Sequence, residues 1–194
     1  MSHVTTRVIR EEHAALSAML RSILLLLAQH RQDGTFPDFK SLRAMLFYVD
    51  EFPEQRHHRK ESQLFFPKLR ARTPLSRDLL DRLDDDHARG EQRVRDLGHA
   101  LLGFEMMGES RREAFERATE RYVSFYLAHM ALEEQEVLPL AERVLTPQDW
   151  AELDEAFGAN RDPLTGHEPD DAYRALFTRI VNAVPAPIGL GAPA

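Results

Sequence analysis

Three histidine and glutamate pairs recur along the chain with the same internal spacing. The pairs are His57 with Glu61, His87 with Glu91, and His129 with Glu133. On an α-helix, residues i and i+4 differ by about 40° around the axis and by about one turn along it. The imidazole and the carboxylate of each pair therefore face the same side, where both could bind one metal ion. One such pair alone would mean little, because this spacing also arises by chance on solvated helix faces.

The composition narrows the chemistry to these residue types. The chain has no cysteine, which excludes disulfides, cysteine-bound zinc, iron–sulfur clusters and a thiol nucleophile. Histidine, aspartate and glutamate remain as the strong metal ligands. The 25 basic and 32 acidic residues give a net charge of −7, and the basic residues are scattered, so we expect no nucleic-acid partner.

The same composition favours a soluble protein with one core. With 194 residues and 43% hydrophobic content, the chain can bury one sizeable core. The first seven residues lack the apolar core of a signal peptide, and the longest aliphatic run, 23–27, is too short to span a bilayer. We therefore expect a cytoplasmic protein with no membrane partner.

Four long amphipathic segments are expected to position the pairs. Apolar residues recur every three or four positions in each segment, which predicts helices. These helices are expected over about 4–31, over about 38–70, from 73 to the glycines at 103 and 108, and over 110–144.

The predicted helix boundaries rest on particular residues. Gly34 suits a left-handed cap, and Pro37 prevents the first helix from continuing. Pro53 and Pro67 lie inside the second helix and predict kinks, because each removes a backbone hydrogen bond. Ser110-Arg111-Arg112-Glu113 has the pattern of a capping box at the start of the fourth helix.

Short connections between long helices predict an all-α fold, an up-down-up-down antiparallel four-helix bundle over residues 1–145. A short C-terminal helical extension is expected over 146–183, with one helix capped at 146–149 and another over 170–182. In the first of these, Trp150 and Phe157 would pack across one end of the bundle or mediate dimerisation, and the oligomeric state is left open. Residues 184–194, rich in proline, glycine and alanine, are expected to be a disordered tail.

The predicted heights of the candidate ligands along the bundle agree. Counting about 1.5 Å per residue from each turn brings the three pairs and His13, on the first helix, to one level facing inward. Burying even one unpaired charge costs several kcal/mol, so we expect metal ions, two of them, among four imidazoles and three carboxylates. A buried histidine–glutamate hydrogen-bond network is the alternative. The predicted metal ligands are His13, His57, Glu61, His87, Glu91, His129 and Glu133.

The combined motif resembles the HHE cation-binding domain of hemerythrin-like proteins. The resemblance covers roughly residues 5–145 and includes the sequence flanking the pairs at 57–67 and 129–139. It implies a four-helix bundle that holds two non-haem iron ions, although the spacing also fits manganese or zinc. When the ligand roles of the family are assigned to the matching residues of this chain, the resemblance makes the four histidines, at 13, 57, 87 and 129, terminal ligands. It makes Glu61 and Glu133 the bridges between the metals.

Glu91 departs from the oxygen carriers of that family, which have a histidine at this position. As a ligand, Glu91 would make the site more anionic and stabilise ferric iron. Bulk oxygen carriage is then less favoured than sensing of, or redox reaction with, oxygen, nitric oxide or peroxide. The alternative is that Glu91 lines the cavity and leaves one metal position open.

Two classes of function stay open, and with them the question of enzymatic activity. A reactive di-iron protein would bind a small diatomic ligand or peroxide, whereas an iron storage, repair or delivery module would have no catalysis of its own. Among the other candidates, His58 would replace His57 if the helix were rotated, and Tyr126 packs in the core or hydrogen-bonds a ligand. Solvated positions are expected for His3, His30, His99, Glu134, Glu136 and His167.

Overall fold

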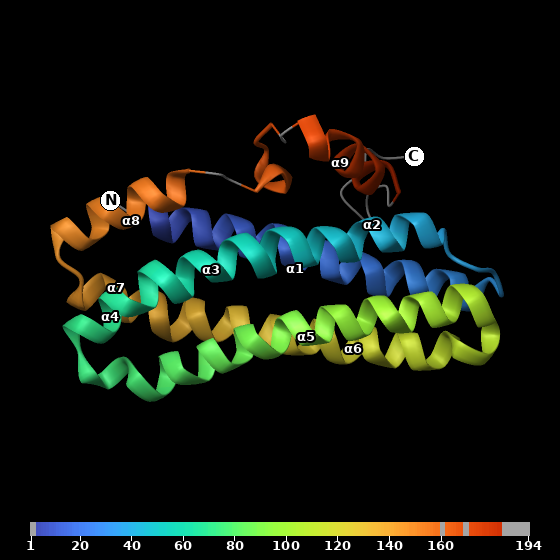
Figure 1. Cartoon of the computed structure of the whole chain (residues 1–194), viewed down its shortest axis with the longest axis horizontal. Coiled ribbons are helices and arrows are strands. Elements are labelled where there is room, and N and C mark those ends of the chain that lie inside the picture. Colours follow the sequence, from blue (N-terminus) through green and yellow to red (C-terminus); the bar gives the residue numbers. More distant parts are fainter. Residues whose placement is uncertain (1–2, 160–161, 169–170, 184–194) are drawn as a thin grey trace.

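The computed structural model describes residues 3–159, 162–168 and 171–183. All secondary structure in these ranges is helical, as the sequence predicts (Figure 1). Across the described ranges, no helix combines the length and the hydrophobicity that crossing a membrane would require. The tail predicted for residues 184–194 lies outside the described ranges.

The first rod is α1 (Val4–Gln32), which differs from the predicted helix by one residue at its end. Its buried stripe includes Ile9, Leu16, Leu20 and Ile23, spaced as on one helix face. Gly34 follows with φ of 65°, the left-handed conformation that glycine adopts without strain. This turn leads directly to the N-cap of the second rod.

The second rod is helical from residue 39 to residue 72, with two π-helical turns inside it. Its segments are α2 (Phe39–Val49), the π-helix η1 (Asp50–His57), α3 (His58–Lys60), the π-helix η2 (Glu61–Phe65) and α4 (Phe66–Arg72). The π turns lie at the prolines for which the sequence predicts kinks. Proline lacks an N–H group and its ring clashes with the carbonyl four residues back. A wider turn, with bonds from His58 N to Pro53 O and from Phe66 N to Glu61 O, accommodates it.

The third and fourth rods meet at a one-residue turn. The third begins with the 3₁₀ turn η3 (Pro74–Ser76), capped by the Thr73 side chain, and continues as α5 (Arg77–Met107). The fourth comprises α6 (Glu109–Leu132), the π-helix η4 (Glu133–Val137) and α7 (Leu138–Val144). Gly108 joins the two rods with φ of 64°.

The predicted capping box at 110–113 is wrong. The fourth rod begins at Glu109, and the Ser110 hydroxyl donates to Met107 O instead. Gly108 reverses the chain in the left-handed region, so it takes the cap position itself and leaves the serine inside the first turn.

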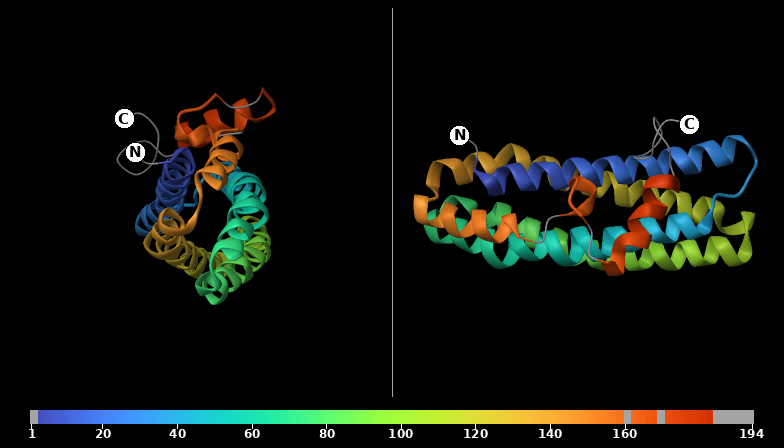
Figure 2. Two further views of the ribbon diagram at one scale, coloured as in Figure 1. Left: turned by 90° about the vertical axis from the view of Figure 1, so that its left-hand side faces the viewer. Right: turned by 90° about the horizontal axis from the view of Figure 1, so that it is seen from above.

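The four rods lie lengthwise side by side around a common interior (Figure 2). α5 packs along α6, α2 packs along α5, and α1 packs along α6. Two separate apolar clusters fill the interior, one around Leu20, Tyr48 and Phe104, the other around Ile9 and Phe66. On the first three rods the candidate ligands lie between the two clusters in sequence. On the fourth, His129 lies beside Met130 of the first cluster and Glu133 lies before Val137 of the second, so apolar packing fixes the rods on both sides of the ligands.

The extension packs onto this bundle through α8 (Pro147–Gly158), the 3₁₀ turn η5 (Pro163–Thr165) and α9 (Asp171–Ala183). The predicted cap at Thr146 is confirmed, because Thr146 and Asp149 form a complete capping box. Trp150 and Phe157 join the apolar cluster around Ile9 and Phe66, so they pack across one end of the bundle.

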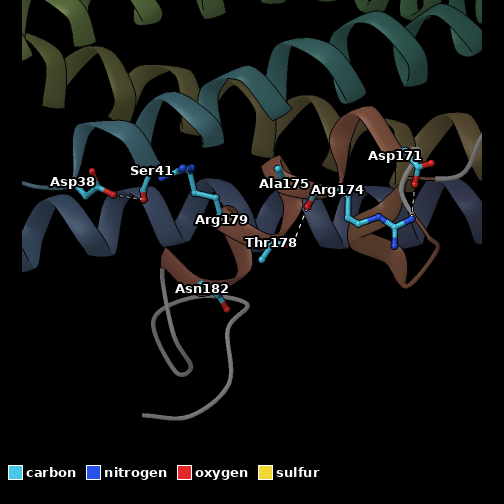
Figure 3. Close-up of a pocket in the computed structure, with 8 residues that line it drawn as sticks. All are labelled: Asp38, Ser41, Asp171, Arg174, Ala175, Thr178, Arg179 and Asn182. Carbon is cyan, nitrogen blue, oxygen red and sulfur yellow. Dashed lines mark hydrogen bonds and ion pairs between the residues drawn. The ribbon is translucent and has the colours of Figure 1, made fainter.

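α9 lies against α2 (Figure 1). Figure 3 shows the groove where it meets the start of α2. There Ser41 donates to Asp38, and Arg174 donates to Asp171. These bonds join residues three positions apart in the chain.

Candidate metal centre

Seven histidine and glutamate side chains from all four rods converge between the two apolar clusters. Each of them is buried. They are His13 of α1, His57 of η1, His58 of α3, Glu61 of η2, His87 of α5, His129 of α6 and Glu133 of η4. Six of the seven predicted ligands are therefore brought together, and His58 joins them in place of Glu91.

Glu61 lies between imidazoles of two rods. Its Oε1 is 3.2 Å from His57 Nε2, and its Oε2 is 3.5 Å from His87 Nε2. The side chain is 1% exposed, so water does not compete for its oxygens.

Glu133 lies in the same way between two other histidines. Its Oε2 is 3.2 Å from His13 Nε2, and its Oε1 is 3.4 Å from His129 Nε2. His129 Nε2 is in turn 3.1 Å from His87 Nε2. Both carboxylates thus face ring nitrogens of two rods, as the bridging role implied by the resemblance requires.

Several atoms at this centre lack a hydrogen-bond partner among the described residues although they are fully buried. They are His57 Nε2, Glu61 Oε2, His129 Nδ1, Glu133 Oε1 and Glu133 Oε2. Leaving a buried polar atom unsatisfied costs about 1–3 kcal/mol. His129 Nδ1 faces Asp86 on the outer side. A cation coordinated by the other four atoms would satisfy them, so the donor set fits a bound metal.

The ligand atoms form two groups that share Glu61. One group is His58, Glu61, His87 and His129, and the other is His13, His57 and Glu61. Within each group the candidate ligand atoms lie within 4.8 Å of one another. Two groups of nitrogen and oxygen donors with one common carboxylate are suited to two neighbouring metal ions.

Each imidazole has a polar neighbour at Nδ1, and four of the five are hydrogen-bonded to it. His13 Nδ1 is bonded to Glu134 at 3.0 Å, and His57 Nδ1 to Glu12 at 2.7 Å. His58 Nδ1 is bonded to Glu54 at 3.1 Å, and His87 Nδ1 to Ser62 at 2.8 Å. His129 Nδ1 is 3.8 Å from Asp86. These contacts turn Nε2 of the rings towards the centre, which is how outer partners orient metal ligands.

Sequence reasoning missed these outer partners, yet a signal for three of them exists. Glu12, Asp86 and Glu134 each stand next to a candidate ligand in the sequence. Adjacent helical residues point about 100° apart, so each acidic neighbour faces a histidine on another rod. Glu12 and Glu134 bond theirs, and Asp86 lies 3.8 Å from His129. Glu134, predicted to be solvated, is half-exposed but bonded to His13.

The two carboxyl groups of the centre differ in acidity. Burial raises the pKa of Glu61, and the charge of Glu133 nearby raises it further. For Glu133, burial acts in the same direction but the charge of His129 and the bond to it outweigh burial and hold the pKa well below its usual range. One carboxyl group therefore stays ionised between its histidines, and the other retains a proton more readily.

The imidazoles fall into two kinds. Burial lowers the pKa of His58 and His87, so both rings stay neutral and able to bind a metal. Burial would also lower the pKa of His129, but Glu133 and Asp86 raise it to about 10. Glutamate partners likewise raise the pKa of His13 and His57 against the effect of burial. Positive charge is therefore favoured where these histidines meet carboxylates.

His58 reaches the centre because of η1. On a regular α-helix, His57 and His58 would point about 100° apart, and only one would face inward. The π-helical turn that ends at His57 changes this register. His58 is 4% exposed and stacks on His87 with ring centroids 4.1 Å apart. Both histidines are therefore inside, rather than one replacing the other.

Glu91 lies at the edge of the centre, half-exposed, with its Oε2 3.6 Å from Arg95 Nη2. It lines a cavity of about 410 Å³ whose wall also includes His58 and His87. It belongs to neither of the two ligand groups among the described residues.

A buried tyrosine pair adjoins His58. The hydroxyls of Tyr122 and Tyr126 both donate to Glu54 Oε1, and burial raises the pKa of Glu54 to about 7. Tyr126 thus packs in the core and also acts on a candidate ligand through Glu54. Gly90 makes room for this, because a Cβ there would lie 2.9 Å from Glu54 Oε1.

The remaining histidines lie away from the centre. His99 and His167 are exposed, as predicted. His3 is half-buried and stacks on Trp150 with ring centroids 4.0 Å apart. His30 is half-buried and bonded to Thr35.

Comparison with known proteins agrees with this geometry. The family model of the hemerythrin HHE cation binding domain matches residues 4–141, a span that contains all seven side chains of the centre and ends before α8 and α9. Neither the curated proteins nor the solved structures gave a match. The residues at 57–61 and 129–133, the helical bundle and the family match lead to one conclusion: this chain belongs to the hemerythrin family of HHE cation-binding domains.

Proposed function

We propose that the bundle, as an up-down-up-down four-helix scaffold, holds two non-haem iron ions at this centre. The observation that carries the proposal is the set of buried, unsatisfied nitrogen and oxygen atoms that face one another there. His13 and His57 would hold one ion. His58, His87 and His129 would hold the other, and Glu61 and Glu133 would lie between the two.

Iron bound in this way supplies electron exchange and a coordination position for oxygen, nitric oxide or peroxide. The chain's own residues restrict the access of water to the centre, since the ligands are buried between two apolar clusters. We propose a role in sensing or stress protection rather than in bulk oxygen carriage.

Access for a small molecule supports this role. The cavity of about 410 Å³ reaches His58 and His87 from the surface, where Arg59 and Glu91 stand on its wall. In our proposal Glu91 lines this cavity. The position beside His87 that a histidine occupies in the oxygen carriers is then left without that ligand.

The experiment is to measure metal content in protein purified without a histidine tag, followed by anaerobic reconstitution with ferrous iron. We expect about two iron ions per chain and, after oxidation, an optical spectrum of bridged ferric iron. Manganese or zinc in the purified protein would correct the identity of the metal. Failure of all three metals to bind in stoichiometric amount would contradict the proposal.

A second candidate function, iron storage, repair or delivery, is favoured by the charge of the same cavity. Glu54, Asp84 and Glu91 line it, and carboxylates along an opening raise the local concentration of cations. The rate at which the protein loses its iron distinguishes the two functions. Rapid loss of iron to a mild chelator would favour handling, whereas a retained centre that is reoxidised over many cycles would favour chemistry.

A further inference from the structure

We propose that Glu12 and Asp162 are positioning residues for His57, and that they make the extension part of the metal centre. The described residues from 147 to 183 are called the C-terminal strap below. The inference rests on the proposed metal function, and it concerns a segment that lies outside the family match at 4–141.

A single carboxylate links the strap to a candidate ligand. The backbone N–H of Asp162 donates to Glu12 Oε1 at 3.3 Å, while Glu12 Oε2 is 2.7 Å from His57 Nδ1. His57 Nε2 on the far side of the ring is 3.2 Å from Glu61. Since Glu12 is held by a bond to the strap, the strap helps to set the position of the His57 ring.

Asp162 is itself fixed by neighbours on both sides. The buried hydroxyl of Tyr48 donates to Asp162 Oδ2 at 2.5 Å, and Leu164 N donates to Asp162 Oδ1 at 2.8 Å. The Thr165 hydroxyl donates to the Asp162 carbonyl at 2.6 Å. A buried carboxylate with this many partners holds its own backbone N–H in one place, which is what Glu12 requires.

The strap is also fastened to η1, the π-helical turn that carries His57, and to α3 directly after it. Before Asp162, the Ala159 carbonyl accepts from Lys60 Nζ at 3.0 Å. After it, Tyr173 donates to Glu51 at 2.6 Å, and Phe177 packs on Phe52. The strap therefore constrains the segment that presents His57, besides the contact through Glu12.

Losing the contact between the strap and Glu12 should affect one of the two metal ions more than the other. His57 belongs to the ligand group with His13, whereas His58, His87 and His129 form the other group. Loss of the link should loosen the metal ion held by His57 and leave its neighbour in place. A general loosening of the fold would instead release both ions faster.

The test follows iron release to a mild chelator from the full chain loaded with ferrous iron. Outer partners of metal ligands are worth about 10–100-fold in affinity. We expect Glu12→Gln to speed release of one of the two ions at least about tenfold, and Asp162→Ala to speed the same ion by a smaller factor. Asp162→Asn, which keeps an acceptor for Leu164 N, should restore near-normal release.

Asp154→Ala is the matched control. Asp154 fastens α8 to α1 by accepting from Thr5 N and Oγ1, and it pairs with His3. Among the described residues, its bonds thus go to the start of α1 and not to Glu12 or His57. Its release kinetics should match those of the wild type. If Asp154→Ala speeds release as much as Asp162→Ala does, the strap acts only on the stability of the fold and the inference is overturned.

Tyr48→Phe keeps the test decisive if Asp162→Ala does not fold. It removes only the hydroxyl that holds Asp162, and it should speed release of the same single ion. Unchanged release in both Glu12→Gln and Tyr48→Phe would overturn the inference while the wild type still binds iron. A wild-type chain that binds no metal would instead contradict the proposed function.

Discussion

At the scale of single residues, the outer partners of the histidines determine what the centre can bind. Each Nδ1 faces a carboxylate or a hydroxyl, so the Nε2 atoms converge on Glu61 and Glu133. Partners of this kind fix the tautomer and raise the basicity of a ligating imidazole. The carboxylates for three of the histidines come from a different rod, so the ring positions depend on how the rods pack.

His58 and Glu91 are expected to contribute unequally to metal binding. His58→Ala removes a buried imidazole from one ligand group, so iron affinity should fall more than about tenfold, given that even outer partners are worth about that much. Glu91→Gln changes a half-exposed side chain beside Arg95 and should leave iron affinity unchanged. Anaerobic titration with ferrous iron measures both. Equal losses in the two variants would show that Glu91 is a ligand.

Gly90 is expected to be sensitive to the smallest substitution. In Gly90→Ala the added Cβ would overlap Tyr126 Oη and lie 2.9 Å from Glu54 Oε1. Overpacking of this kind costs about 1–3 kcal/mol, more than the roughly 1 kcal/mol that alanine gains over glycine in a helix. Urea unfolding should therefore show a lower free energy of unfolding.

Gly98→Ala is the control in the same helix. Nothing lies within 4 Å of a Cβ at Gly98, so this variant should gain about 0.5–1 kcal/mol of stability. If both variants were stabilised to the same degree, the close approach of Tyr126 and Glu54 to α5 would be wrong.

At the scale of elements, the second and fourth rods share one feature, a π-helical turn that begins at a glutamate. The π-helices η2 and η4 begin at Glu61 and Glu133, and a proline follows six residues later in each case, at 67 and 139. The turn lets the chain pass the proline without breaking the rod. In both rods, the first residue of the π turn is therefore a glutamate that is a candidate metal ligand, and the helix continues after it.

The π turns also mark where prediction from the sequence ends. Helix bounds such as Val4–Gln32 and the cap at Thr146 follow from local signals: apolar spacing, a glycine and a capping box. The inward position of His58 could not be predicted, because a regular 3.6-residue period assigns it to another face. The same regular period predicts that Glu91 faces inward with His87, whereas Glu91 lies beside Arg95 at the wall of the cavity.

Asp149 offers a pH-dependent test of the α8 cap. The bond from Arg72 holds its pKa well below the usual range. Because the folded pKa is depressed, this contribution is present above the unfolded value of about 3.9 and is lost as pH falls below it. Asp149→Ala should therefore lower the free energy of unfolding by about 1 kcal/mol at neutral pH.

The difference from wild type should shrink on acidification below about pH 4. Glu155→Ala, on the exposed face of the same helix, serves as the control and should change stability little at either pH. Urea unfolding at several pH values measures all three proteins. A difference between Asp149→Ala and wild type that stays constant down to pH 2 would contradict the depressed pKa.

At the scale of the whole molecule, the fold places a layer of charge between two apolar clusters. The clusters are separate, one around Tyr48 and Phe104, the other around Ile9 and Phe66. Their packing holds the four rods in register, while the unsatisfied atoms of Glu61 and Glu133 between them oppose folding. The metal-free protein is therefore expected to fold, but with a free energy of unfolding well below that of the metal-bound protein.

This balance predicts that metal binding and thermal stability are linked. A ligand that binds only the folded state at a concentration of about 100 times its Kd adds about 2.7 kcal/mol. For a chain of this size that corresponds to a rise in Tm of roughly 5–10 °C. Calorimetry of the chelator-treated protein, with and without added ferrous iron under anaerobic conditions, measures the shift.

Glu133→Gln separates linkage at the centre from unspecific effects of iron. Glutamine keeps the shape of the side chain but removes the charge that faces His13 and His129. Without metal, this variant should melt below the wild type, because the positive charge that Glu133 favours on His13 and His129 loses its buried partner. With metal, most of the rise in Tm should be lost. An equal rise in both proteins would place the stabilising iron away from Glu133, and no rise in either would mean that the unsatisfied atoms do not serve a metal.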